Sequence, residues 1–246
     1  MTKKHFIIVF IFLFLVVLIA GGIRYFFVDR SDIPSPNDIQ TSSSATTFPP
    51  AVPEGYDILI NKNPAMREDL KKNLTDKFNG TIEGLKTDSW NSLLWYDLGS
   101  IKYSFEDYKG AESAWKYAIK IDPLATFALM NLATLYQYKI PDYPEAERIL
   151  RIVIENEPKI AMQAYSEIFD LYRYRYKEKA NLAEGVMLEA YREFPDQHAI
   201  LKTIAWYYLE QKNDTKAIEY FEKFLAKAPG DASAQEELDR LKNSSL

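Results

Sequence analysis

Four prolines at nearly even spacing constrain the fold of this 246-residue chain more than any other feature. They are Pro123, Pro158, Pro195 and Pro229. Their separations are roughly 34 to 37 residues, a period typical of helix-turn-helix repeats. One such unit cannot bury its apolar face alone, so the spacing predicts an all-α stack of antiparallel helical hairpins.

Small residues recur at fixed offsets within these intervals. In the first predicted helix of a unit they are Gly99, Ala133 and Ala205, and in the second they are Ala111, Ala146, Ala183 and Ala217. Small side chains let paired helices approach at the short end of the usual range of about 8–10 Å. We therefore expect Gly99→Leu to destabilise the fold by overpacking.

The pattern resembles the tetratricopeptide repeat family over most of residues 92–229. The residues that fall on the signature positions of the first repeat are Trp95, Leu98, Gly99, Ala111, Trp115, Ala118 and Pro123. Those of the second are Leu129, Leu132, Ala133, Tyr136, Ala146, Leu150 and Pro158, and those of the fourth are Leu201, Ile204, Ala205, Tyr208, Ala217, Phe221 and Pro229. The resemblance implies an α-α superhelix, a right-handed solenoid of helix hairpins, with four repeats at 92–125, 126–160, 161–197 and 198–230.

The third repeat fits the pattern least well. Its matching residues are Ala164, Ile168, Leu171, Ala183, Met187, Ala190 and Pro195. Ile168 stands at the offset of the small residue, so we expect this helix pair to be splayed.

The flanks of the array have the features of caps. Residues 56–91 are expected to form an N-terminal capping helix, with Asn63 as N-cap, Pro64 at the first position and Asn79-Gly80 as a candidate kink. Its apolar stripe is Met66, Leu70, Leu74, Phe78 and Ile82. Residues 231–246 are expected to form a C-terminal capping helix with Asp231 as N-cap, facing Ala234, Leu238 and Leu241 inward.

Residues 6–23 are uninterruptedly apolar, which predicts a transmembrane signal-anchor within residues 1–28. Lys3 and Lys4 precede the run, and the bias favours a cytoplasmic N-terminus with an extracytoplasmic C-terminal body. A cleaved signal peptide is the alternative, because the small residues at 20–22 could form a cleavage site. Residues 29–55 are rich in Pro, Ser and Thr, which is typical of a flexible linker.

The composition argues against several classes of function. The net charge of -5 argues against a nucleic-acid partner, because such proteins gain affinity from many cations. There is no cysteine and there are only two histidines, so no thiolate nucleophile or His-based metal cluster can be assembled. We expect neither a cofactor nor a metal, and no enzyme.

The stretch LYRYRYKEK, residues 171–179, alternates tyrosine with arginine. The repeat register predicts that it extends the first helix of repeat three by about one turn. Tyr172 and Tyr176 then pack, while Arg173, Arg175 and Lys177 are solvated. A local binding edge for an acidic peptide or anionic headgroups is the alternative interpretation.

The family resemblance implies a concave groove lined by the first helix of each repeat. The corresponding residues are Tyr96, Ser100, Tyr103, Met130, Asn131, Thr134, Tyr165, Phe169, Tyr172, Arg173, Lys202 and Trp206. This set has many aromatic and few charged side chains, which suits a protein or peptide partner. Only Asn131 and Lys202 suggest the carboxylate-binding set of the co-chaperone members, so that ligand is not carried over.

Three hypotheses follow. The first is a membrane-anchored scaffold or adaptor that binds a protein in its groove and helps assemble an envelope complex. The second is a soluble exported adaptor, released after signal cleavage. The third is an enzyme or carbohydrate-binding module that uses the groove tyrosines.

Overall fold

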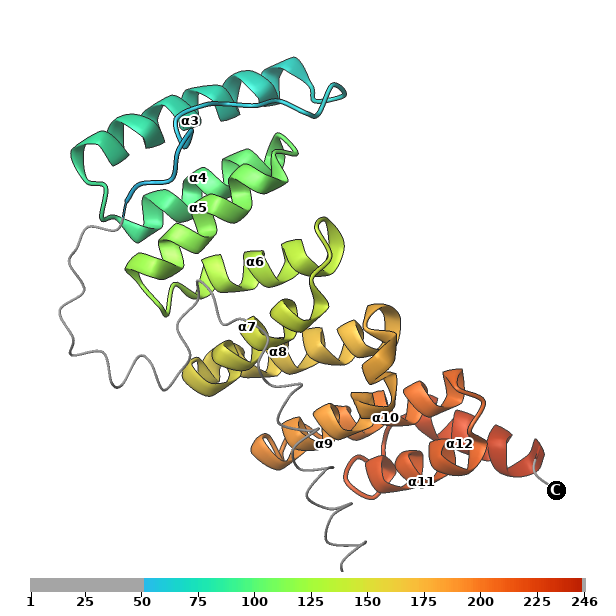
Figure 1. Cartoon of the computed structure of the whole chain (residues 1–246). Helices are drawn as coiled ribbons and strands as arrows, with labels where there is room; N and C mark the ends of the chain where they lie inside the picture. Colours follow the sequence, from blue (N-terminus) through green and yellow to red (C-terminus); the bar gives the residue numbers. More distant parts are fainter. Residues whose placement is uncertain (1–50, 245–246) are drawn as a thin grey trace, which may run out of the picture.

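The computed structural model describes residues 51–244, and in this range the chain forms ten α-helices and no strand. The helices follow one another as an elongated stack, with α3 at one end and α12 at the other (Figure 1). The predicted anchor and most of the predicted linker lie outside the described residues. Within residues 51–244 no helix combines the length and the apolarity that crossing a membrane requires.

Four antiparallel helix pairs form the body, as the proline spacing predicts. They are α4 (Ser92–Ser104) with α5 (Tyr108–Ile121), α6 (Thr126–Tyr138) with α7 (Tyr143–Asn156), α8 (Pro158–Asp170) with α9 (Ala183–Glu193), and α10 (Ala199–Glu210) with α11 (Asp214–Leu225). Each helix contacts mainly its neighbours in the sequence. The third pair begins at Pro158, three residues before the expected boundary, because proline is well suited to the first helical turn.

Side-chain caps fix where several of these helices begin. The carboxylate or amide oxygen of Asn91, Asp107, Asp142 and Asn213 accepts a hydrogen bond from the backbone N–H three residues on. Each cap satisfies one of the N–H groups that a helix leaves unpaired at its start. The short turns between hairpin helices are therefore specified locally.

The small residues lie where helices approach most closely. A Cβ on Gly99 would stand 2.4 Å from Nε1 of Trp115 on the paired helix. Ala111, Ala133, Ala146 and Ala217 are fully buried. The expected register is confirmed for repeats one, two and four.

A tyrosine links each of repeats two, three and four to the repeat before it. The hydroxyl of Tyr136 donates to Glu112 at 2.7 Å, and that of Tyr172 donates to Glu147 at 2.6 Å. Tyr208 donates to Glu184 in the same way. Each glutamate follows the buried alanine at the start of the preceding second helix, so the three junctions are equivalent.

These junctions correct the register of repeat three. Tyr172 is equivalent to Tyr136 and Tyr208, and the residue three positions earlier is Phe169, where repeats two and four have alanine. The large residue at the small-residue offset is therefore Phe169, and the assignment to Ile168 was wrong by one position. The α8–α9 pair makes fewer contacts than the other three pairs, as expected for a splayed hairpin.

The tyrosine-arginine stretch continues α8 as η1 (Leu171–Arg175), a π-helical turn, followed by η2 (Lys177–Leu182), a 3-10 helix. Tyr172 is buried and its ring lies 6.2 Å from that of Tyr176, which confirms that these two pack. The prediction that Arg173 is solvated was wrong. Its guanidinium lies 4.8 Å from the ring of Phe169 and 4.5 Å from that of Tyr174, because the wider π turn directs it back over α8.

The N-terminal cap differs from the expected helix. The backbone carbonyl of Asn63 accepts from the N–H of Met66 in a turn. Helix α3 (Glu68–Thr87) begins only at Glu68, with Arg67 at the N-cap position. The helix continues through residues 79 and 80 without a break. The residues before α3 are extended because their polar groups bond to α4: Lys102 Nζ donates to the Ile58 carbonyl, and Lys62 N–H to that of Phe105.

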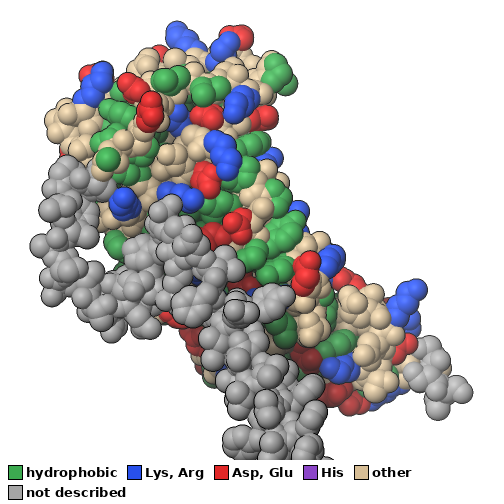
Figure 2. All heavy atoms as spheres, in the orientation of Figure 1, with side chains coloured by type: hydrophobic (Ala, Val, Ile, Leu, Met, Phe, Trp, Pro, Cys, Tyr) green, Lys and Arg blue, Asp and Glu red, His purple; other side chains and the backbone are tan. Residues whose placement is uncertain are grey.

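The C-terminal cap has the expected form. Helix α12 (Ala232–Ser244) follows Asp231, whose carboxylate accepts from the N–H of Ala234 at 2.9 Å. Ala234, Leu238 and Leu241 are buried against the last repeat. Figure 2 shows both signs of charge scattered over the visible face, without one large patch of a single sign.

Candidate functional site

The first helices of the four repeats, α4, α6, α8 and α10, carry the twelve predicted groove residues, with Tyr172 and Arg173 in the π turn after α8. Eight of the twelve are half-buried and keep a solvent-facing surface: Tyr96, Ser100, Tyr103, Met130, Asn131, Thr134, Arg173 and Lys202. Trp206 is exposed, and its ring meets that of Phe221 edge-on at 5.4 Å.

Three predicted groove residues belong instead to the core. Tyr165, Phe169 and Tyr172 are buried. The hydroxyl of Tyr165 donates to Glu193 at 2.9 Å, and that of Tyr172 is engaged at the repeat junction. A ligand in the groove could not reach these two hydroxyls, so the proposed enzyme or carbohydrate site on them has no support in the geometry.

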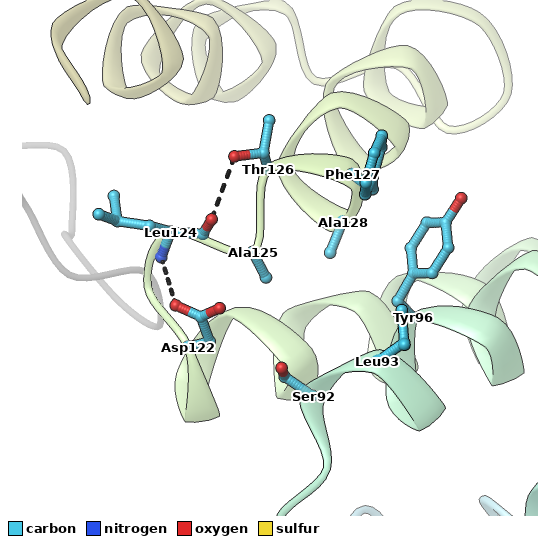
Figure 3. Close-up of a pocket in the computed structure, with 9 residues that line it drawn as sticks. All are labelled: Ser92, Leu93, Tyr96, Asp122, Leu124, Ala125, Thr126, Phe127 and Ala128. Carbon is cyan, nitrogen blue, oxygen red and sulfur yellow. Dashed lines mark hydrogen bonds between the residues drawn. The ribbon is translucent and has the colours of Figure 1, made fainter. Parts of the chain in front are cut away.

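An apolar pocket of about 250 Å³ lies between the N-terminal ends of α4 and α6. Its wall residues converge from these two helices and from the turn before α6, as Figure 3 shows. Leu93 is 59% exposed and Phe127 is 70% exposed, although both side chains are large and apolar. The rings of Tyr96 and Phe127 lie 5.8 Å apart across the pocket.

The surface around this pocket carries few charges. Asp122 is the one charged residue in the pocket lining, and its carboxylate accepts from the N–H of Leu124 at 3.0 Å. Helix α6 contains no charged residue. On α4, Lys102 is buried, and Asp97 is half-buried near Lys77 of α3, where burial raises the pKa of its carboxyl. The hydroxyls of Ser100 and Thr134 donate to carbonyls of their own helices, at 3.0 and 2.9 Å. We call this surface, formed by Leu93, Tyr96, Ser100, Phe127, Met130 and Thr134, the uncharged face.

Sequence reasoning missed Leu93 and Phe127, the two most exposed residues of the uncharged face. The signal was present, because a surface helix of a globular protein normally has a polar stripe. The segment TFALMNLATLYQY lacks a charged stripe altogether. The solvent-facing part of α6 is therefore uncharged.

The part of the groove over α8 and α10 is different in character. Arg173 pairs with Glu210 and, at 3.5 Å, with Asp170, so its charge is neutralised within the groove. Lys202 pairs with Asp231 at 2.8 Å. These charges already have partners inside the fold, which leaves little net charge to recognise a ligand.

The tyrosine–glutamate hydrogen bonds at the repeat junctions stabilise the stack. Burial and the hydrogen bond to Glu112 raise the pKa of Tyr136 well above its ordinary value, so its proton stays in place to be donated. Burial works to raise the pKa of Glu112, but the bonds from Tyr136 and Lys109 outweigh it and the pKa is lowered. A neutral phenol donating to a carboxylate is therefore the stable state of the junction at neutral pH.

The described residues contain no group of three or more His, Cys, Asp or Glu side chains placed to hold a metal ion.

The geometry defines a solenoid of helical hairpins with a groove built from the first helix of each pair. Residues 172–232 match the family model described as tetratricopeptide repeat. No curated protein matches the chain. The match lies within the third and fourth hairpins, and the all-helical stack of four hairpins is consistent with a tetratricopeptide-type superhelix.

Proposed function

We propose that this protein is a scaffold that binds a partner protein on its uncharged face, and that residues 1–28 anchor it in a membrane. Tetratricopeptide repeats generally mediate protein–protein interaction, and their fold is typically that of a scaffold rather than an enzyme. The membrane part of the proposal is supported by the apolar run at residues 6–23.

The observation that carries the binding proposal is the exposure of Leu93 and Phe127 beside a pocket. Leaving apolar area in water costs about 25 cal/mol per Å² relative to burying it. Contiguous apolar patches are uncommon on monomers and mark interaction sites. A partner that covers the uncharged face would recover this free energy, and Asp122 is the one charged side chain that it would meet in the pocket lining.

The pocket indicates what the partner should present. It accommodates one aliphatic or aromatic side chain between Leu93, Tyr96 and Phe127. Binding energy at interfaces concentrates in such buried anchors. We therefore propose an uncharged partner segment with a central apolar residue, and no direct role for the ion-paired half of the groove.

The proposed setting of the protein is based on the N-terminal residues. An anchor with a cytoplasmic N-terminus places the repeats outside the cytoplasm, and a linker of about 27 residues spans about 30 Å on average. This arrangement suits a protein that assembles an envelope complex near a bilayer. Intact mass of the mature chain distinguishes the anchor from the cleaved exported form.

In-cell crosslinking tests the site. A photoreactive amino acid at Ser100, within the uncharged face, is expected to give partner adducts in the parent chain. Phe127→Asp places a charge in the pocket and is expected to reduce these adducts at least about 30-fold, as for a hot-spot residue.

The matched control is Leu182→Asp, which changes an equally apolar residue that is 46% exposed in η2, away from the groove. Its adducts should match those of the parent chain. Adducts that survive Phe127→Asp and disappear with Leu182→Asp would place the interface elsewhere. Circular dichroism of both variants verifies that each remains folded.

A further inference from the structure

Arg175 is the one half-buried arginine in the described part of the chain whose guanidinium no carboxylate neutralises. The other half-buried arginines, Arg148, Arg151 and Arg173, each pair with an aspartate or glutamate. The Arg175 guanidinium instead stacks on the ring of Tyr138, with its central carbon 3.9 Å from the ring centre. Among the described residues it has neither an ion pair nor a hydrogen bond, so its N–H groups are available to a ligand.

The π turn after α8 brings this guanidinium to the end of α6. Arg175 is the last residue of η1, and within residues 51–244 no other helix pair contains a π turn. Tyr138 is the last residue of α6 and is 46% exposed. Figure 1 shows the end of α8 and the α6–α7 turn at the same edge of the stack, opposite the α5–α6 loop. The Arg175–Tyr138 pair is therefore a product of the irregular third repeat and not of the repeat pattern.

Tyr138 lies on the same side of α6 as the uncharged face. At 3.6 residues per turn, positions seven and eleven residues after Phe127 point in nearly the same direction, and these positions are Thr134 and Tyr138. Eleven residues of helix rise about 16 Å, which is the length of roughly five extended residues. An extended segment that fills the pocket at Phe127 and follows α6 therefore reaches the Arg175–Tyr138 pair.

The chemistry of this pair suits a carboxylate. A guanidinium that stacks on an aromatic ring uses its flat face and keeps the N–H groups at its edge for a planar, bidentate partner. Because the Tyr138 ring excludes water from one side, the two charges would attract each other more strongly than a fully solvated pair. Lys139, the next residue, is exposed, and its amine lies 5.3 Å from the Tyr108 ring. It adds a second positive charge beside the site.

We propose that Arg175, held on Tyr138, binds an Asp or Glu side chain of the partner segment whose apolar residue fills the pocket. The acidic residue stands about five positions from the apolar one, beyond the uncharged stretch that covers the face between them. A peptide is favoured over an anionic headgroup because the site ends the same stripe of α6 that begins at the pocket. This inference rests on the uncharged face being the binding site of the proposed function.

Peptide display tests the spacing without the natural partner. A random dodecapeptide library on phage is selected against the full parent chain in phosphatidylcholine nanodiscs and, in parallel, against Arg175→Gln. Peptides from the parent chain are expected to carry an apolar residue with Asp or Glu about five positions away. For such a peptide, Arg175→Gln and replacement of the acidic residue by its amide should each weaken binding about three- to tenfold, and together no more than either alone.

Arg192→Gln is the matched control, because it removes an exposed arginine from the last turn of α9. It should leave the acidic preference and the affinity unchanged, and thermal melts check that both variants stay folded. Equal acidic preference in the parent and Arg175→Gln selections would overturn the inference, as would its absence from the parent selection. Loss of the preference when phosphatidylglycerol replaces phosphatidylcholine would overturn it too, and would assign Arg175 to a headgroup.

Phe127→Asp separates this inference from the proposed function. Peptides that lose affinity for Phe127→Asp but show no acidic preference leave the pocket standing and overturn only the Arg175 site. Peptides that bind Phe127→Asp as tightly as the parent chain overturn the pocket as the binding site. A parent selection that returns no binding peptide overturns both.

Discussion

The two halves of the groove are built from equivalent helices but present opposite surfaces. Over α4 and α6 the uncharged face consists of apolar residues and of Ser100 and Thr134, whose hydroxyls bond within their own helices, and Phe127 projects with 70% of its surface exposed. Over α8 and α10 the corresponding surface contains Arg173 and Lys202, both in ion pairs. Equivalent helices thus present different surfaces because their side chains, and those of the adjoining turns, differ.

The first repeat differs from the other three in how the same helix position is satisfied. Repeats two, three and four place Tyr136, Tyr172 and Tyr208 at the junction with the preceding repeat. The first repeat has no preceding hairpin, and there Lys102 bonds to the extended N-terminal segment instead. The position serves as a connector in every repeat, with a different partner at the end of the stack.

The largest effect is expected at Lys102, whose amine lies 3.6 Å from the carboxylate of Asp107 with both side chains buried. Lys102→Met leaves Asp107 buried with only Lys62, at 3.7 Å, to balance its charge. Breaking a buried pair in this way costs about 3–5 kcal/mol. Lys202→Met removes the half-exposed pair with Asp231 and should cost under about 1 kcal/mol. Urea unfolding of both variants measures the difference, and equal losses would contradict the proposed contrast.

A change of side-chain volume at the small-residue offset should destabilise the closely packed first hairpin more than the splayed third one. Gly99→Leu would drive atoms into Trp115, and we expect a loss of about 1–3 kcal/mol. Phe169→Leu, at the same offset in repeat three, reduces volume in the loosest pair and should cost less than about 1.5 kcal/mol. Thermal melts compare the two, and a Gly99→Leu protein as stable as the parent would refute the register.

Removing a tyrosine hydroxyl from a junction should lower the free energy of unfolding by an intermediate amount. The loss depends on which hydrogen-bond partners the glutamate keeps. Tyr172→Phe leaves Glu147 with Lys179 alone and should cost about 1–2 kcal/mol. Tyr208→Phe should cost less, because Glu184 keeps Tyr220 at 2.6 Å and Lys216 at 3.1 Å. Denaturant unfolding of the two variants ranks the junctions. The reverse order would show that the additional bonds to Glu184 contribute nothing.

The fold was predictable from the sequence because its determinants are local. Each of its signals acts within one hairpin: the prolines, the helix caps and the small residues at fixed offsets. These signals predict the order of the helices and the register of repeats one, two and four. Repeat three failed because a π turn follows α8 and Phe169 replaces an alanine, so similarity to the other repeats misaligned it by one position.

The site was harder to predict for a related reason. Family positions identified Tyr96, Met130 and Thr134, but exposure depends on the next repeat as well. Tyr165 and Tyr172 are covered by carboxylates 24 to 28 residues away in sequence, which a motif does not encode. The extended N-terminal segment was missed because Asn63-Pro64 suits a helix start locally, whereas its bonds to α4 are long-range.

The smallest expected effect is a pH dependence of the junctions. The pKa values of Glu112 and Glu184 are lowered: burial alone would raise them, but hydrogen bonds from tyrosine and lysine outweigh it. A carboxyl with a lowered folded pKa stabilises fully above its unfolded value, about 4.3, and this contribution is lost as the pH falls through the folded value. Unfolding midpoints should therefore decline below about pH 4.3. Glu184→Gln should be less stable than the parent at pH 7 and should show a smaller further decline in acid. If the variant declines as steeply as the parent, the acid sensitivity arises outside that junction.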